Sequence, residues 1–167
     1  MIIFDASTLI LITKIELLEA LLGSISMEAA IPREVHRACC GSKKTLDSLV
    51  IQKAVDDSRI RVVAVKNRKL ADRLRDDFGL GSGEAEAIAL ALQTSALLVG
   101  MDDKNGINAC KLLGISFTTA AGVLILCRQR NLISLDDALL RLDRLASYGR
   151  YKISIVADIR VRLEVGT

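Results

Sequence analysis

Four acidic residues of this 167-residue chain are candidates for shared chemistry: Asp5, Glu84, Asp102 and Asp103. Asp5 directly follows the apolar residues 2–4, and the two later aspartates directly follow a second apolar run. A carboxylate at the end of a buried strand is destabilising by several kcal/mol unless something neutralises it. Clustered carboxylates are held together by protonation or by hard cations such as Mg²⁺ and Mn²⁺. The pattern therefore favours a metal site.

Glu84 belongs to the stretch GSGEAEAIALAL, residues 81–92, which predicts a helix with Glu84 in its first turn. Helical spacing puts Glu84 and Ile88 on the same side, whereas Glu86 points elsewhere. Each of the four acids also has a simpler role, as a helix cap or as a complement to a helix dipole. Acids from three separate segments at one edge favour the metal site over these separate roles.

The elements that must position these acids are short strands alternating with longer helical stretches. Five aliphatic or β-branched runs predict strands at 2–4, 29–31, 61–65, 96–99 and 115–117. Apolar residues at helical spacing lie between them, including one apolar stripe formed by Leu9, Ile12, Ile15, Leu18 and Leu22. This alternation predicts an α/β fold, a parallel sheet covered on both faces. In such a sheet, ligands bind beyond the carboxyl ends of the strands, where the candidate acids lie.

The C-terminal part of the chain has a different pattern. It predicts two helices, at 134–146 with Ser134 as N-cap and at 154–164, although the second segment also alternates like a strand. We therefore expect one domain at 1–133 and a helical extension at 134–167. That extension packs on the same domain, forms a two-fold dimer or receives a partner peptide.

Composition limits the possible environments of the protein. Hydrophobic residues make up 51% of the chain and aromatic residues only 3%, so the core must be aliphatic. No uncharged stretch is long enough to span a bilayer, and no basic leader precedes the first apolar residues. The four cysteines lack metal-binding spacing, which favours reduced thiols in the core. We expect a cytoplasmic protein without membrane contact.

Net charge says little about partners, because it is only +3. The distribution of charge says more, since residues 59–75 contain seven basic residues and a single acid, Asp72. Such a segment either follows the phosphates of a nucleic acid or is an ordinary solvated helix face.

Four stretches together carry a family resemblance: FDASTLI, GEAEAIALA, VGMDDKNGINACKLLGI and AAGVLILCRQRNLIS. In this order and spacing they resemble the PIN-domain nucleases, and most closely a VapC-related branch that ends in an extra helical pair. The resemblance covers nearly the whole chain. It implies a three-layer α/β/α sandwich and a ribonuclease that depends on Mg²⁺ or Mn²⁺, in which acidic residues hold the metal that activates water.

The resemblance assigns roles residue by residue. Asp5 matches the first acid of the family and Glu84 the acid on the central helix. Asp102 matches the acid after the fourth strand, and Asp103 an accompanying acid. Ser7 matches a small polar residue whose hydroxyl orients water on the metal, although it can equally cap the first helix.

The chain departs from the family pattern in three places. Family members carry a further Glu on the helix after the second strand, where this chain has Ala38. Glu34 lies one helical turn earlier on the same face, so it either reaches the metal or serves the helix N-terminus. Ile107 replaces a common Arg, and TTAAG replaces a Gly-Thr pair, so that Thr118 or Thr119 would supply the hydroxyl.

Two functions follow as hypotheses. The first is an endoribonuclease dependent on Mg²⁺ or Mn²⁺ that cleaves single-stranded or structured RNA, as a homodimer and as the toxin of a pair with an antitoxin protein. The second is a catalytically weakened or inactive PIN-like module that binds RNA or a protein partner. The loss of an acid at Ala38 favours the second, whereas the four acids kept together favour the first.

Overall fold

A five-stranded parallel sheet organises the computed structural model, which describes residues 1–41, 45–149 and 151–165. The strands are β1 (Ile2–Phe4), β2 (Ala29–Pro32), β3 (Ile60–Val63), β4 (Leu98–Gly100) and β5 (Phe117–Thr118). Their order in the sheet is β3-β2-β1-β4-β5, and every neighbouring pair is parallel. The predicted α/β fold with a central parallel sheet is therefore confirmed.

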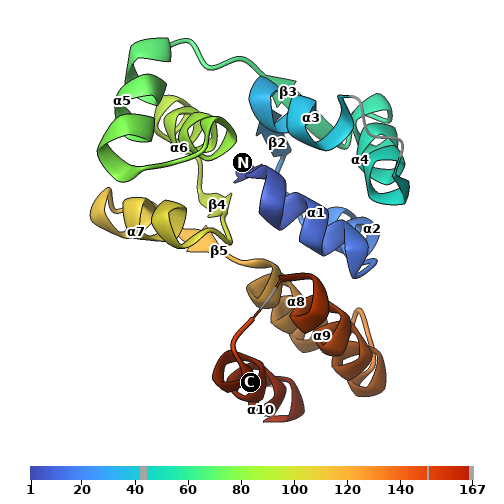
Figure 1. Ribbon diagram of the computed structural model, residues 1–167. Helices are drawn as coiled ribbons and strands as arrows, with labels where there is room; N and C mark the ends of the chain where they lie inside the picture. Colours follow the sequence, from blue (N-terminus) through green and yellow to red (C-terminus); the bar gives the residue numbers. More distant parts are fainter. Residues whose placement is uncertain (42–44, 150, 166–167) are drawn as a thin grey trace.

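Helices cover both faces of this sheet and give three layers (Figure 1). They are α1 (Ala6–Lys14), α2 (Leu18–Ser24), α3 (Arg33–Cys40), α4 (Leu46–Asp56), α5 (Arg68–Phe78), α6 (Ser82–Thr94), α7 (Lys104–Leu112), α8 (Ala120–Gln129), α9 (Leu135–Gly149) and α10 (Ile153–Val165). Helices α5, α6 and α7 lie on one face, and α1 to α4 with α8 lie on the other. None of the described helices is long and apolar enough to cross a membrane.

The central strand β1 is buried on both sides because its residues alternate between the two layers. Ile2 and Phe4 join the core formed with α1 and α8, whereas Ile3 joins the core formed with α6. All three side chains are at most 3% exposed. Continuous apolar strands are typical of a sheet with both faces covered, which explains the uninterrupted run before Asp5.

The single apolar stripe expected over residues 9–22 is divided between two helices. Helix α1 ends at Lys14, and Glu16 adopts a left-handed conformation with φ 58°. The N–H of Leu17 then bonds back to the carbonyl of Ile12 at 3.0 Å, as in a common helix C-terminal motif. All five residues of the predicted stripe still belong to one core. The break between the helices was not predicted, because Glu is a weak signal for a conformation that usually selects Gly.

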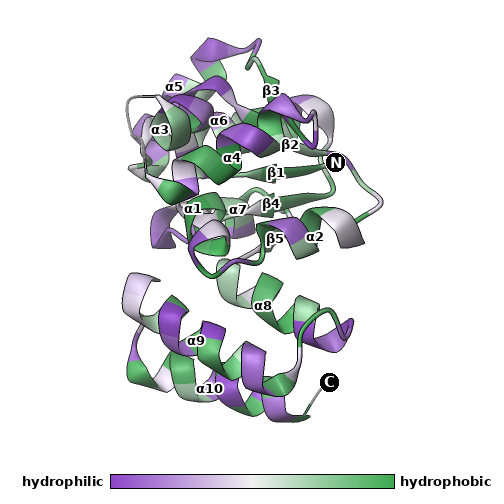
Figure 2. Ribbon diagram, turned by 90° about the vertical axis from the view of Figure 1, so that its right-hand side faces the viewer, coloured by the Kyte–Doolittle hydropathy of each residue, from purple (hydrophilic) through white to green (hydrophobic). Residues whose placement is uncertain are grey.

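The C-terminal segment forms two helices that share the core of α1 and α8. Ser134 accepts a hydrogen bond from the N–H of Asp137 at 3.1 Å at the start of α9, as the predicted cap requires. The alternating segment is the helix α10, packed through Ile159 and Leu163. In Figure 2 both helices lie beyond the β5 end of the sheet, next to α8.

None of the four cysteines forms a disulfide, in agreement with reduced thiols that serve packing. Cys39, Cys110 and Cys127 are buried, and Cys40 is half-buried. Burial raises the pKa of each of the thiols Cys40, Cys110 and Cys127, so these are neutral near pH 7.

We expect Leu142→Ala in α9 to lower the free energy of unfolding by about 2–5 kcal/mol, because Leu142 is fully buried and truncation leaves a cavity. Leu140→Ala in the same helix is the matched control, since Leu140 is 54% exposed, and its effect should stay within about 0.5 kcal/mol. Urea denaturation measures both. Equal effects would mean that α9 does not share the core.

Candidate functional site

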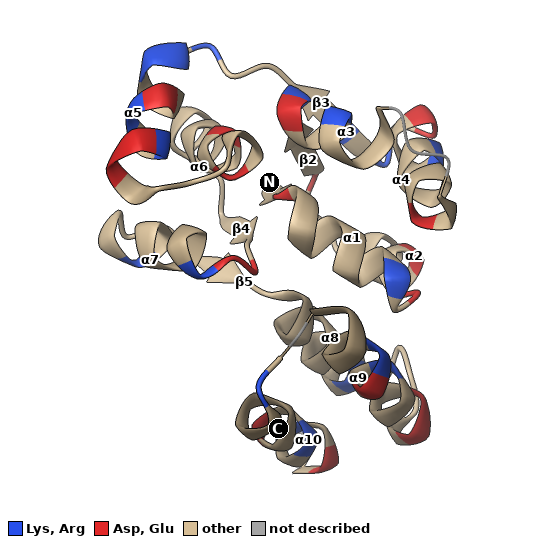
Figure 3. Ribbon diagram, viewed as in Figure 1, with Lys and Arg blue, Asp and Glu red and all other residues tan. Residues whose placement is uncertain are grey.

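Strand pairing brings the segments after β1, β4 and β5 to one edge of the sheet. Phe4 is in register with Gly100, and Gly100 with Thr118. The N–H of Asp5 donates to the carbonyl of Gly100 at 3.0 Å, and that of Met101 donates to Thr118 at 2.8 Å. Acidic segments accordingly lie at the ends of β1 and β4 (Figure 3). The register and backbone hydrogen bonds of these strands thus explain why acidic segments lie together at this edge, as predicted.

Gly100 allows this close approach of β1 and β4. A Cβ atom at this position would lie 2.5 Å from the ring of Phe4 and 3.1 Å from the methyl group of Thr8. Phe4 and Thr8 are both fully buried in a closely packed core, so neither side chain can move away. A residue larger than glycine would therefore push apart the two strands that carry Asp5 and Asp102.

Asp5 is a buried N-cap, with only 1% of its surface exposed. Its two carboxylate oxygens accept hydrogen bonds from the N–H of Thr8 at 2.8 Å and from the hydroxyl of Ser7 at 2.5 Å. Burial raises the pKa of Asp5 from 3.8 to about 6, hydrogen bonds from Ser7 and Thr8 oppose this rise, and the negative charge of Asp102 adds to it. Asp5 thus caps α1 and also carries a costly buried charge.

Asp102 is held by residues far from it in the sequence. One oxygen, Oδ2, accepts from the N–H of Ala120 at 2.8 Å, and the other, Oδ1, accepts from the hydroxyl of Tyr151 at 2.5 Å. Burial and the negative charge of Asp102 raise the pKa of Tyr151, so the hydroxyl remains a proton donor. Sequence reasoning missed Tyr151, because no local spacing relates residues 49 positions apart.

Asp103 and Glu84 form the second half of this edge. Asp103 is the N-cap of α7 and accepts from the N–H groups of Asn105 at 2.7 Å and Gly106 at 3.2 Å. Glu84 accepts from the N–H of Gly81 at 2.9 Å. Burial raises the pKa of Glu84, the N–H of Gly81 opposes the rise, and the negative charge of Asp103 adds to it. The simpler capping roles are therefore real for these two acids.

The four acids interact as two pairs, Asp5 with Asp102 and Glu84 with Asp103. Among the described residues, no three or more His, Cys, Asp or Glu side chains are grouped closely enough to hold a metal ion. The capping bonds explain this, since each carboxylate is tied to the start of a helix. Mg²⁺ usually keeps several waters and binds through one or two carboxylates together with substrate phosphates. A pair of carboxylates fits that mode of binding.

The candidate acids differ from the other buried acid in having no basic partner. Glu86 is 3% exposed, forms an ion pair with Arg68 and also accepts from the N–H of Glu34 at 3.2 Å. In the described parts of the chain, none of the four candidate acids forms an ion pair with Lys or Arg. Their charge is uncompensated by the protein, and all their donor atoms are the oxygens that Mg²⁺ and Mn²⁺ prefer.

The remaining candidate residues have structural positions. Glu34 lies in the first turn of α3 and pairs with Arg37, as its helix-terminal role predicts. Ala38 is exposed on the same helix. Thr119 is the N-cap of α8, where its hydroxyl accepts from the N–H of Gly122 at 3.1 Å.

Ion pairs neutralise much of the basic segment 59–75. Four of its seven basic residues contact acids: Arg59 with Glu19, Arg61 with Glu28, Arg68 with Glu86, and Arg75 with Asp72 and Asp76. Paired cations attract phosphates less strongly than free ones. The segment is therefore a weaker phosphate-binding surface than its composition predicts.

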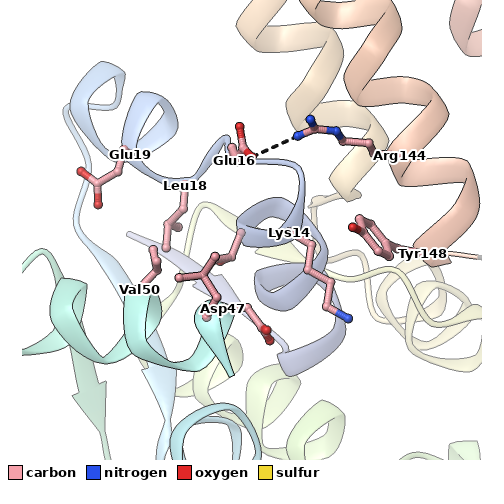
Figure 4. A pocket seen from close by; sticks show the side chains of 10 residues that line it. Lys14, Glu16, Leu18, Glu19, Asp47, Val50, Arg144 and Tyr148 are labelled. Atoms are coloured by element: carbon pink, nitrogen blue, oxygen red, sulfur yellow. Dashed lines mark hydrogen bonds and ion pairs between the residues drawn. The ribbon is translucent and has the colours of Figure 1, made fainter. Parts of the chain in front are cut away.

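Two cavities differ in their relation to the acids. One of about 430 Å³ is lined by Asp102, Thr119 and Tyr151 and by residues of α8 and α10. Another of about 680 Å³ lies between α1, α2, α4 and α9, with Lys14 and Tyr148 on its wall (Figure 4). The second cavity contains none of the candidate acids and lies at the end of α1 opposite Asp5. Of these two cavities, the first borders the candidate acids.

Ionisation of Asp5 should destabilise the metal-free fold. Its pKa is raised on folding, so the folded chain keeps a proton that the unfolded chain releases between pH 3.8 and about 6, and stability falls as the pH rises through this range. We expect Asp5→Asn, which keeps an acceptor for Thr8, to be more stable than wild type at about pH 7.5 by up to about 3 kcal/mol. The difference should nearly vanish at about pH 4.

Urea denaturation of both proteins with EDTA at the two pH values measures this effect. Asp136→Asn is the control, because Asp136 is an exposed acid in the first turn of α9. A variant of Asp5 that is less stable than wild type at both pH values would contradict the raised pKa.

Comparison of the chain with known protein families gives a match. A family model described as a PIN domain matches residues 1–162. Comparison with curated proteins gave no significant match, and comparison with solved structures gave none either. The match covers nearly the whole chain and agrees with the parallel sheet and its acidic carboxyl edge. The chain belongs to the PIN-domain family.

Proposed function

We propose that this protein is a ribonuclease that hydrolyses RNA phosphodiester bonds with Mg²⁺ or Mn²⁺. The observation that carries the proposal is the presence of two carboxylate pairs, Asp5 with Asp102 and Glu84 with Asp103, that have no basic partner among the described residues. Asp5 of the first pair is only 1% exposed. Leaving a buried charge uncompensated is destabilising, and a divalent cation at this edge would relieve it. Membership of the PIN-domain family, whose members are generally nucleases, supports the same reaction class.

Within this proposal, Asp5 and Asp102 hold the cation, and Glu84 with Asp103 supplies a second pair of oxygen donors. When bound there, the cation polarises the phosphoryl group and offsets the charge that develops on it. The hydroxyl of Ser7 donates a hydrogen bond to Asp5 and so orients that carboxylate. The backbone N–H of Ala120 does the same for Asp102.

A second function, a module that binds RNA or protein without cleaving it, is favoured by one specific observation. Each of the four acids already accepts backbone hydrogen bonds that stabilise a turn or helix start. Those bonds give the acids a structural purpose without any metal. Ala38, on the exposed face of α3, adds no carboxylate to the edge.

Other parts of the hypothesis stay predictions, drawn from the family resemblance or from the composition and pattern of the sequence. These are the VapC-related branch, the toxin role, the homodimer, the antitoxin partner and the cytoplasmic location. The same holds for the division at residue 133 and for metal contacts by Glu34 or Thr119.

We expect purified protein to cleave single-stranded RNA with Mn²⁺ or Mg²⁺ and to lose this activity with EDTA. Asp5→Asn and Asp102→Asn should each reduce the rate about 100-fold or more, because each removes a charge from the pair that holds the cation. Gel assays of RNA cleavage measure the rates.

Asp136→Asn serves as the matched control and should cleave like wild type, since Asp136 lies on the surface of α9. Cleavage at wild-type rates by both site variants would show that these acids are not the site. Metal-dependent binding of RNA without cleavage by the wild type would support the second function instead.

A further inference from the structure

We propose that Tyr151 is a positioning residue that holds the Asp102 carboxylate in the orientation in which it binds the cation. The inference rests on the proposed function, because it takes Asp102 as a ligand. It gives Tyr151, which precedes α10, a part in the site, although Tyr151 lies outside the four stretches on which the family resemblance rests.

The contact itself joins a side chain of the C-terminal helical pair to the end of a central strand. The hydroxyl of Tyr151 donates to Oδ1 of Asp102 at 2.5 Å. The ring is half-buried and packs against the core that α1, α8 and α9 share. Packing of the ring therefore fixes the position of the Tyr151 hydroxyl.

Two bonds restrain the Asp102 carboxylate on both of its oxygens. Tyr151 bonds to Oδ1, and the N–H of Ala120 bonds to Oδ2 at 2.8 Å. Each carboxylate oxygen has two lone pairs, so both oxygens keep capacity for a cation after accepting one bond. Rotation of the carboxylate would break both bonds. Outer hydrogen bonds of this kind orient metal ligands in proteins and raise metal affinity.

The last residue of α9, Gly149, lies directly against the ring of Tyr151. A Cβ atom at Gly149 would lie 2.2 Å from Cε2 and 2.7 Å from Cδ2 of Tyr151. A side chain at this position would therefore displace the ring and with it the hydroxyl. Glycine at the last position of the helix is thus a second, independent requirement of the contact between Tyr151 and Asp102.

Asp102 also remains accessible on the side of this contact. It lines the cavity of about 430 Å³ together with Tyr151, and the charged residues Lys152, Asp158 and Arg162 line the same cavity. Neither Lys152 nor Arg162 forms an ion pair among the described residues. The positioned carboxylate therefore faces a space that also contains two basic side chains able to contact the phosphates of a polyanionic substrate.

The test is the affinity for Mn²⁺, measured by isothermal titration calorimetry without RNA. Tyr151→Phe keeps the ring and removes the hydroxyl, and we expect affinity to fall about 10-fold or more. Tyr148→Phe is the matched control, because Tyr148 is 50% exposed and lines the other cavity, and its affinity should equal that of wild type.

A double-mutant cycle separates positioning from a general effect on folding. If Tyr151 acts through Asp102, adding Tyr151→Phe to Asp102→Asn should cause no further loss of Mn²⁺ affinity. Gly149→Ala should reproduce the loss seen with Tyr151→Phe, and circular dichroism checks that each variant is folded.

Each remaining outcome overturns the inference in a distinguishable way. Wild-type affinity in Tyr151→Phe, with binding abolished by Asp5→Asn, would overturn the role of Tyr151 and leave the metal site intact. Independent, additive losses in the double variant would mean that Tyr151 does not act through Asp102. Absence of Mn²⁺ binding by the wild type would overturn this inference, and absence of Mn²⁺-dependent RNA cleavage as well would overturn the proposed function.

Discussion

Parallel pairing of β1 with β4 places two carboxylates, Asp5 and Asp102, beside each other at one edge of the sheet. The pairing depends on Gly100, because the Phe4 ring occupies the space of a side chain there. Burial of Asp5 then makes its negative charge costly, and no basic residue of the described chain offsets that charge. The architecture of the site follows from this one uncompensated charge and from the helices that begin around it.

The N-termini of three helices supply the hydrogen bonds that stabilise the carboxylates at this edge of the sheet. Asp5 caps α1, Asp103 caps α7, and Asp102 accepts from the first residue of α8. The same bonds that stabilise these helices also fix the direction of each carboxylate. Capping and metal binding are therefore compatible, since an oxygen that accepts one N–H retains a second lone pair for a cation. Glu86 shows the alternative, in which a buried acid is neutralised by an arginine and is unavailable to a cation.

The C-terminal helices connect to this edge in addition to covering the core. Leu142 and Leu145 of α9 are fully buried with residues of α1 and α8, which anchors the helix. The anchored helix ends at Gly149, and the chain then presents Tyr151 to Asp102. A segment whose sequence indicates only two helices thus contacts one of the candidate metal-binding carboxylates.

The sequence by itself determined the fold class and the edge at which the acids gather. Strand and helix periodicities are local properties, so alternating runs predicted the parallel sheet, and residues directly after two strands predicted Asp5 and Asp102 at its carboxyl end. Only the tertiary structure decided which groups neutralise or hold each acid. The bond from Tyr151 to Asp102, the pairing of Glu86 with Arg68 and the grouping of the four acids into pairs depend on how distant elements pack. A local pattern carries no information about such packing, because side chains many residues apart meet only after the layers have formed.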